Sequence, residues 1–271
     1  MKMVSYFIKN IPANRIMIMW SLGVSSIIGV LTVMALRITI PYDKMTMLRD
    51  AFSLAFAFVF GFSSSTSASA IVSSYAYQSR SFGFLFHRMG IKKINLLGSL
   101  ISGMIIAFLI NGIYLFLFLL ILIKLKFGIW AVPVKIAMNA PLIMLMSIID
   151  GLIFTSISLL VVSIILISSK TKLITYARYF PLLLYIITFV IITNGIHGIG
   201  EYIFPYSSLF YVFNYLFSGS NIYYENVTHP VNPNLFLCTS SILVFLAFVI
   251  IILYLLVDHI YVRGGQAERQ F

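Results

Sequence analysis

Charged residues are scarce in this 271-residue chain, and their scarcity argues against a water-soluble fold. Only 9% of the residues are charged and 61% are hydrophobic, whereas an average soluble domain has roughly 25% charged residues. Several stretches run for more than twenty residues without Lys, Arg, Asp or Glu, about the length of a helix that crosses a bilayer. Because a helix satisfies its own backbone hydrogen bonds in lipid, the sequence predicts an all-α polytopic membrane protein.

The chain also lacks the residue patterns that catalysis needs. The single cysteine, Cys238, excludes an intrachain disulfide and a cysteine metal cluster, so we expect it to fill space in a helix. The sequence has no GxxxxGK[ST] loop for nucleotide phosphates, no HExxH motif and no paired carboxylates, and its four histidines are scattered. We therefore expect neither an enzyme nor a resident cofactor or metal.

Six apolar segments are the predicted transmembrane spans. They cover residues 16–36, 51–73, 95–123, 139–167, 174–194 and 235–257. An amphipathic helix at 1–12 is expected to lie on the membrane surface ahead of them, and residues 37–50 are expected to form a short loop. Asn139 and Pro141 suit the cap and first turn of the fourth span.

Basic residues predict the orientation. The net charge is +11, and with the N-terminus inside, twelve Lys and Arg fall in inner segments and six in outer ones. Cytoplasmic segments carry the excess of basic residues, so we expect a cell-membrane protein with both termini in the cytoplasm. We then expect the basic residues to interact with membrane lipids rather than with nucleic acid. The sequon at Asn226 falls in an external loop, 195–234, where glycosylation could reach it.

Within that loop, residues 203–217 are apolar but short for a span, which favours a re-entrant or surface-lying helix. Had they crossed the membrane, the sequon would be cytoplasmic. Their aromatic side chains fit either a lipidic cargo or anchoring at the bilayer surface. The aromatic residues of this region are Tyr202, Phe204, Tyr206, Phe210, Tyr211, Phe213, Tyr215 and Phe217.

Small and polar residues inside the spans predict close helix contacts and a candidate translocation path. The second span carries hydroxyl residues from Ser63 to Ser69, and the third pairs Gly98 with Ser102 and Ser99 with Gly103, spacings that allow helices to approach. Asp150 is the only acidic residue deep within a span, where charge is costly. Asp150, Asn111, Ser64 and Ser67 are either path elements or hydrogen-bonding groups between helices.

The connector between the second and third spans, 74–94, is basic and aromatic. On a helix, Phe82, Leu85, Phe86 and Met89 share one face, while Arg80, Phe84, His87 and Arg88 share the other. Phe84 on a basic face suits the groove of a cytosolic partner. The alternative is an amphipathic helix that faces lipid, with Lys92 and Lys93 on headgroups.

The order of these features resembles the transmembrane subunit of a type-2 ABC transporter permease, the type V exporter fold, over essentially the whole chain. The most family-like stretch is SFGFLFHRMGIKKINLLGSLISG, residues 81–103. The resemblance implies that residues 78–93 form a coupling helix against a separate ATPase subunit. Its contacts would be Arg80, Phe84, His87, Arg88 and Lys92. Gln78 and Ser79 stand where the family commonly has acidic residues.

The function implied by the resemblance is ATP-driven export. Two permease subunits, identical or homologous, would enclose the path, and a dimer of ATPase subunits would bind ATP and Mg. An ATP-independent secondary transporter or channel, and a membrane scaffold subunit, remain alternatives. The ion-driven alternative predicts more ionisable residues in the membrane, or inverted repeats with broken helices.

Overall fold

The computed structural model describes residues 15–35, 45–89, 93–127, 134–167, 173–193, 202, 205–219, 223–224, 230–231 and 233–267. In these residues four helical stretches are long and apolar enough to cross a membrane: Phe52–Ser73, Leu97–Lys126, Asn139–Ile165 and Leu235–Leu255. Two shorter helical stretches, Met19–Met34 and Phe180–Val190, are also apolar. The chain is therefore a helical, membrane-embedded protein, as its composition predicts. The N-terminal segment 1–12, Lys92 and Asn226 lie outside the described residues.

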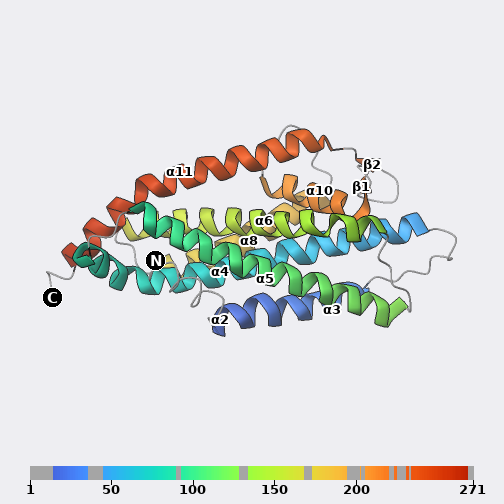
Figure 1. Cartoon of the computed structure of the whole chain (residues 1–271), viewed down its shortest axis with the longest axis horizontal. Helices are drawn as coiled ribbons and strands as arrows, with labels where there is room; N and C mark the ends of the chain where they lie inside the picture. Colours follow the sequence, from blue (N-terminus) through green and yellow to red (C-terminus); the bar gives the residue numbers. More distant parts are fainter. Residues whose placement is uncertain are drawn as a thin grey trace.

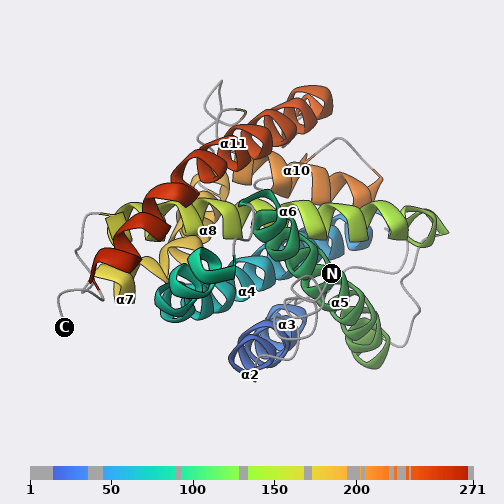
Figure 2. The ribbon, with the colours of Figure 1, turned by 60° about the vertical axis from the view of Figure 1, so that its left-hand side comes forward.

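Long helices run side by side along the longest axis of the molecule (Figure 1). They are α4 (Met45–Met89), α5 (Lys93–Phe127), α6 (Val134–Ile167) and α11 (Leu235–Ala267). The first apolar segment consists of α2 (Arg15–Ile18), the π-helix η1 (Met19–Val24) and α3 (Ser25–Ala35). Viewed from a second direction, α2 and α3 lie on the flank of the bundle near α4 and α5 (Figure 2).

Helix α4 is longer than the sequence predicts. Residues 45–50, expected in a loop, and 74–89, expected in a separate connector, both continue the helix of the second span. No proline occurs between Met45 and Met89, so no residue lacks the backbone N–H that continues the helix. The predicted coupling segment is thus, as far as Met89, the continuation of a membrane helix.

The fourth helix begins earlier than expected. Helix α6 starts at Val134, which places Pro141 inside the helix instead of in its first turn. Asn139 does not cap the helix, because its Nδ2 donates a hydrogen bond to the Leu216 carbonyl at 3.0 Å. The prediction that Asn139 and Pro141 begin the fourth helix is therefore wrong. Asn139 instead makes a contact between two helices.

The fifth apolar segment is broken in two. Helix α7 (Ile174–Ala177) ends in a turn at Arg178 and Tyr179, and α8 (Phe180–Thr193) begins directly before Pro181. The turn is closed by a hydrogen bond from the Tyr179 N–H to the Tyr176 carbonyl at 3.0 Å. Proline cannot donate to the preceding turn and its ring clashes with the carbonyl four residues back, which explains the break.

Helix α10 (Pro205–Ser218) is a core element of the bundle. Thirteen of its fourteen residues are buried, and it packs against α4, α6 and α11. The surface-lying alternative for residues 203–217 is therefore wrong. A short antiparallel ladder, β1 (Tyr223–Tyr224) with β2 (Pro230–Val231), follows α10.

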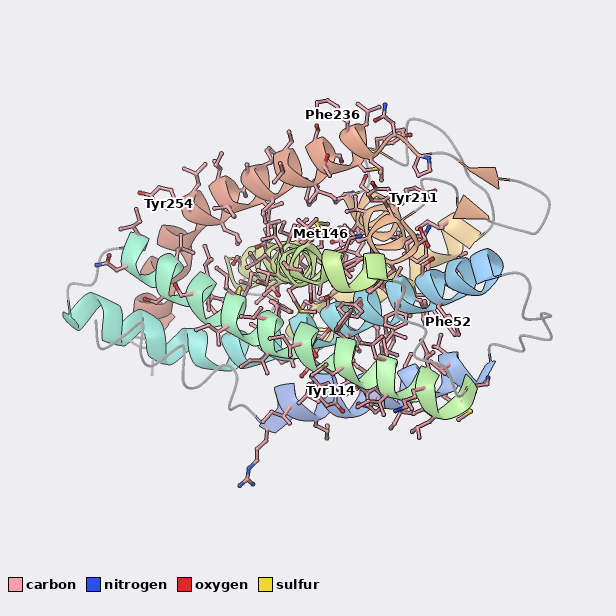
Figure 3. The ribbon with its side chains drawn as sticks, turned by 45° about the vertical axis from the view of Figure 1, so that its right-hand side comes forward. Phe52, Tyr114, Met146, Tyr211, Phe236 and Tyr254 are labelled. Atoms are coloured by element: carbon pink, nitrogen blue, oxygen red, sulfur yellow. The ribbon has the colours of Figure 1, made fainter. Side chains whose placement is uncertain are left out.

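The buried aromatic residues of α10 hold the bundle together. The Phe217 ring lies 4.8 Å from that of Phe56, and the Phe213 ring 5.6 Å from that of Phe60. Figure 3 shows Tyr211 among the helices, while Phe236 and Tyr254 extend outward from α11. Because Tyr206, Phe210, Tyr211, Phe213 and Phe217 are all buried, these five side chains pack within the bundle and do not anchor it at the bilayer surface.

Glycines set the closest helix contacts, at Gly61 in the predicted small-residue stretch of the second span, where an added Cβ would lie 2.5 Å from the Tyr185 ring, and also at positions that were not predicted. A Cβ on Gly151 of α6 would lie 2.2 Å from the Phe108 ring of α5, and one on Gly112 would lie 2.9 Å from Ser147 Oγ. Gly98 meets nothing within 4 Å, so its pairing with Ser102 is not a packing contact. Ser99, by contrast, is buried as predicted.

Two further contacts fix individual elements. Asn234 caps α11, its side-chain oxygen accepting the N–H groups of Phe236 and Leu237 at 3.1 and 3.3 Å. Lys126 Nζ donates to the Val33 and Met34 carbonyls at 2.6 and 2.8 Å, at the end of α3. Cys238 is a buried thiol within α11, which confirms that it fills space in a helix.

Candidate functional site

A layer of hydroxyl side chains lies buried in the middle of α4. Ser63, Ser64, Ser65, Thr66 and Ser67 are each at most 1% exposed. Several of these hydroxyls donate hydrogen bonds to backbone carbonyls of the same helix. Thr66 Oγ1, for example, donates to the Ser63 carbonyl at 3.0 Å. Such local bonds reduce the cost of burying a hydroxyl. They leave the oxygen lone pairs available to neighbouring helices.

Asn111 of α5 joins this layer. Its Nδ2 donates to Ser63 Oγ at 2.8 Å and approaches Ser67 Oγ at 3.4 Å. Ser63 Oγ in turn donates to the Ser21 carbonyl of η1 at 3.3 Å. Asn111 is therefore a hydrogen-bonding link between α4 and α5, the role expected of an amide within a membrane bundle.

Asp150 of α6 lies beside the same hydroxyl layer, next to Ser64. It is 1% exposed, and its carboxyl lies close to Ser64, although neither Asp150 Oδ2 nor Ser64 Oγ has a well-formed hydrogen bond among the described residues. Tyr185 of α8 and Tyr206 of α10 lie within electrostatic range of this carboxyl. Asp150 is the only acidic side chain that the structure describes.

We call Ser63, Ser64, Ser67, Asn111 and Asp150 the polar cluster. The structure brings together all four predicted path residues within it. Along α4 and α5 the cluster separates two apolar clusters, one around Phe56 and Leu119 and the other around Val72 and Met104. The polar cluster thus forms a buried polar layer between two apolar layers.

The polar cluster also has unsatisfied hydrogen-bonding capacity. Within the described part of the chain, Asn111 Oδ1 and the Tyr206 hydroxyl lack a partner, as do Asp150 Oδ2 and Ser64 Oγ. Buried polar atoms without partners are costly, about 1–3 kcal/mol each. These atoms, gathered between α4, α5, α6 and α10, can accept or donate hydrogen bonds to a water molecule or another polar group.

Tyr185 and Tyr206 are members of this site that the sequence did not indicate. Tyr185 is held by a hydrogen bond from its hydroxyl to the Phe58 carbonyl at 2.6 Å, and its ring fills the space beside Gly61. Tyr206 stacks against Phe154 with ring centroids 4.5 Å apart. No sequence signal distinguished these two tyrosines from the other aromatic residues of the chain.

No known protein family, curated protein or solved structure matches the chain. Function is therefore inferred from the geometry of the chain itself. Among the described residues, no three or more His, Cys, Asp or Glu are grouped so that they could hold a metal ion.

The predicted coupling residues occupy the far end of α4. Arg80, Phe84, His87 and Arg88 all fall on its helical backbone, which extends without interruption to Met89. The polar cluster and the predicted coupling residues are thus parts of one helix. Their side chains, like Lys92, are outside what the structure describes.

Proposed function

We propose that the chain is the transmembrane subunit of an ATP-driven exporter, with a separate ATPase dimer as its motor. It would cross the cell membrane six times, by α2–η1–α3, α4, α5, α6, α7–α8 and α11, with both termini in the cytoplasm. Two such subunits, identical or homologous, would enclose the path. The polar cluster is this chain's contribution to that path.

The length of α4 carries the proposal. Its 45 residues span about 67 Å at 1.5 Å per residue, more than twice the roughly 30 Å hydrocarbon core of a bilayer. The apolar stretch Phe52–Ser73 suffices to cross the membrane. Residues 74–89 therefore extend up to about 24 Å beyond it, on the side that the basic residues assign to the cytoplasm.

A continuous helix supplies a route for coupling. An ATPase that binds the projecting end of α4 more tightly in one conformation shifts the whole bundle toward that conformation. The same helix carries Ser63, Ser64 and Ser67, so a tilt or rotation at its end moves the hydroxyl layer against Asn111 and Asp150. The unsatisfied atoms of the polar cluster would gain partners in the alternative arrangement.

Co-purification tests the proposal directly. The chain, tagged at its C-terminus and extracted in mild detergent from its native membrane, is expected to retain an ATP-binding-cassette ATPase in equimolar amount. ATP turnover of the reconstituted complex should exceed that of the free ATPase. A chain that is recovered alone, or that leaves the turnover of the ATPase reconstituted with it unchanged, would refute the proposal.

One observation favours a second candidate, an ion-driven transporter. Helix α10 is a short buried helix whose first turn, at Tyr206, lies beside Phe154 and near Asp150. Secondary transporters place the ends of discontinuous helices at their binding sites. In that case Asp150 would bind and release a cation during each cycle.

Replacing Asp150 with asparagine separates the two candidates. Asparagine keeps the size and hydrogen-bonding capacity of the side chain but cannot carry a charge. Because it also avoids the cost of a buried charge, we expect ATP-dependent transport by this variant to remain within about twofold of wild type. The measurement is cargo flux in proteoliposomes with ATP inside or an ion gradient imposed. Loss of flux by tenfold or more in a correctly folded variant would favour the ion-driven candidate.

A further inference from the structure

A second site borders the hydroxyl layer of α4, in a cavity of about 190 Å³ between η1, α4 and the α7–α8 turn. One water needs only about 10–15 Å³ of such space, so the cavity is large enough for a molecular group. Its polar and aromatic lining is formed by Trp20, Thr66, Ser69, Ser73, Arg178 and Tyr179. None of these residues belongs to the predicted coupling segment or to the polar cluster as defined above.

Two irregularities of the backbone form this cavity. Trp20 lies in the π-helical stretch Met19–Val24, and single π-turns within membrane helices frequently mark functional sites. Arg178 and Tyr179 occupy the turn that Pro181 imposes between α7 and α8. Regular helices at these positions would direct Trp20 and Arg178 elsewhere, so the two deviations together create the site.

The cavity lies at the boundary between apolar and polar membrane levels. Arg15 precedes Trp20 by five residues, Arg80 follows Ser73 by seven, and Arg178 precedes the apolar stretch Phe180–Val190 by two. Three helical segments thus have an arginine near this cavity in sequence, at the end of an apolar segment. Phospholipid headgroups occupy this level of a bilayer, and Trp and Tyr concentrate there.

The residues that line the cavity present a defined set of hydrogen-bond donors and acceptors. Arg178 Nε is buried and has no hydrogen-bond partner among the residues that the structure describes, while the guanidinium carbon of Arg178 lies 4.6 Å from the centroid of the Tyr179 ring. Ser69 and Ser73 donate their hydroxyl protons to the carbonyls four residues earlier, at 2.9 and 2.7 Å. The site therefore offers an anion a charged donor and offers a hydroxyl group two acceptor oxygens.

We propose that this cavity binds the headgroup of an anionic phospholipid that carries hydroxyl groups, such as a phosphatidylglycerol. The phosphodiester would accept hydrogen bonds from Arg178, and the headgroup hydroxyls would donate to Ser69 and Ser73. Tyr179 is 44% exposed at the rim, which leaves the cavity open to the surrounding lipid. Arginine pairs with phosphate through charge-assisted hydrogen bonds, and basic pockets between helices on the cytoplasmic side bind anionic headgroups.

Retention of lipid by the purified chain tests the proposal. The protein is reconstituted in nanodiscs of equal phosphatidylglycerol and phosphatidylcholine, released, and analysed by native mass spectrometry. Wild type is expected to retain one phosphatidylglycerol. Arg178→Gln should retain at least fivefold less, and Arg178→Lys should lie between the two. The matched control is Arg15→Gln, an exposed arginine at α2 that does not line the cavity, and it should stay within twofold of wild type.

Three outcomes would overturn the proposal. Retention could be unchanged in Arg178→Gln, it could fall equally in Arg15→Gln, or inorganic phosphate at millimolar concentration could displace the lipid and bind with the same dependence on Arg178. The last result would identify a site for a free anion. If Arg178→Gln fails to fold by size exclusion, Ser73→Leu carries the test, because it fills the cavity while keeping the arginine. Its retention should fall at least fivefold.

Discussion

Alanine at both Phe84 and Arg88 is expected to lower transport-coupled ATP turnover by at least about 30-fold. Aromatic and arginine anchors at protein interfaces commonly contribute 2 kcal/mol or more each, and 2 kcal/mol corresponds to about a 30-fold change in affinity. Both residues lie on the part of α4 that extends past the apolar stretch. The measurement is ATP turnover of the reconstituted complex, together with the amount of ATPase that co-purifies.

The matched control replaces one phenylalanine and one arginine outside the coupling segment. Phe236 is 76% exposed on α11 and Arg15 is exposed on α2, so Phe236→Ala with Arg15→Ala removes the same groups from the surface. This pair should leave turnover and co-purification within twofold of wild type. Normal turnover and a retained ATPase in the Phe84 and Arg88 variant would show that the coupling site lies elsewhere.

Alanine at Gly151 is expected to destabilise the bundle by about 1–2 kcal/mol. The added Cβ would lie 2.2 Å from Phe108 Cδ1 and 2.3 Å from Cγ, and Phe108 is fully buried at 0% exposed. Overpacking of this kind costs about 1–3 kcal/mol, which exceeds the gain of up to about 1 kcal/mol in helix propensity. The thermal midpoint in detergent should fall by roughly 2–8 °C.

Gly98→Ala is the control for this substitution. Gly98 is helical, and an added Cβ there meets nothing within 4 Å, so the variant should melt at or slightly above the wild-type temperature. The Gly151 variant should also weaken transport, since a shift of α6 away from α5 moves Asp150, the residue before Gly151, relative to the hydroxyl layer of α4. A Gly151→Ala protein that melts with wild type would contradict the close packing of α5 on α6.

The sequence predicted the interior chemistry better than the helix boundaries. The predictions that Asn111 bonds between helices and that Cys238 fills space are confirmed. Burial of these residues follows from their type and from the apolar segments around them. The start of α6 was misplaced because Pro141 is tolerated within a helix whose neighbours bond the freed groups, which no local pattern reveals.

Helix α10 shows why the packing of the helices against one another could not be predicted from the sequence. Fifteen apolar residues are too short to span a bilayer, yet a surface-lying helix and a helix inside the bundle share that composition. Burial depends on the facing surfaces of α4, α6 and α11, which are distant in sequence. Likewise, whether a glycine lies at a close contact depends on the partner helix, as Gly98 and Gly151 demonstrate.

The amino-acid sequence by itself determined that this protein lies in a membrane as a set of helices, because the free energy of placing apolar side chains and backbone in lipid depends on composition and segment length. Only the tertiary structure decided that the predicted coupling segment continues α4 as far as Met89, that α10 fills the core, and that Arg178 lines a cavity with Trp20. These features arise from packing between segments far apart in the chain. The order of residues along one chain does not by itself show which helix surfaces pack against each other.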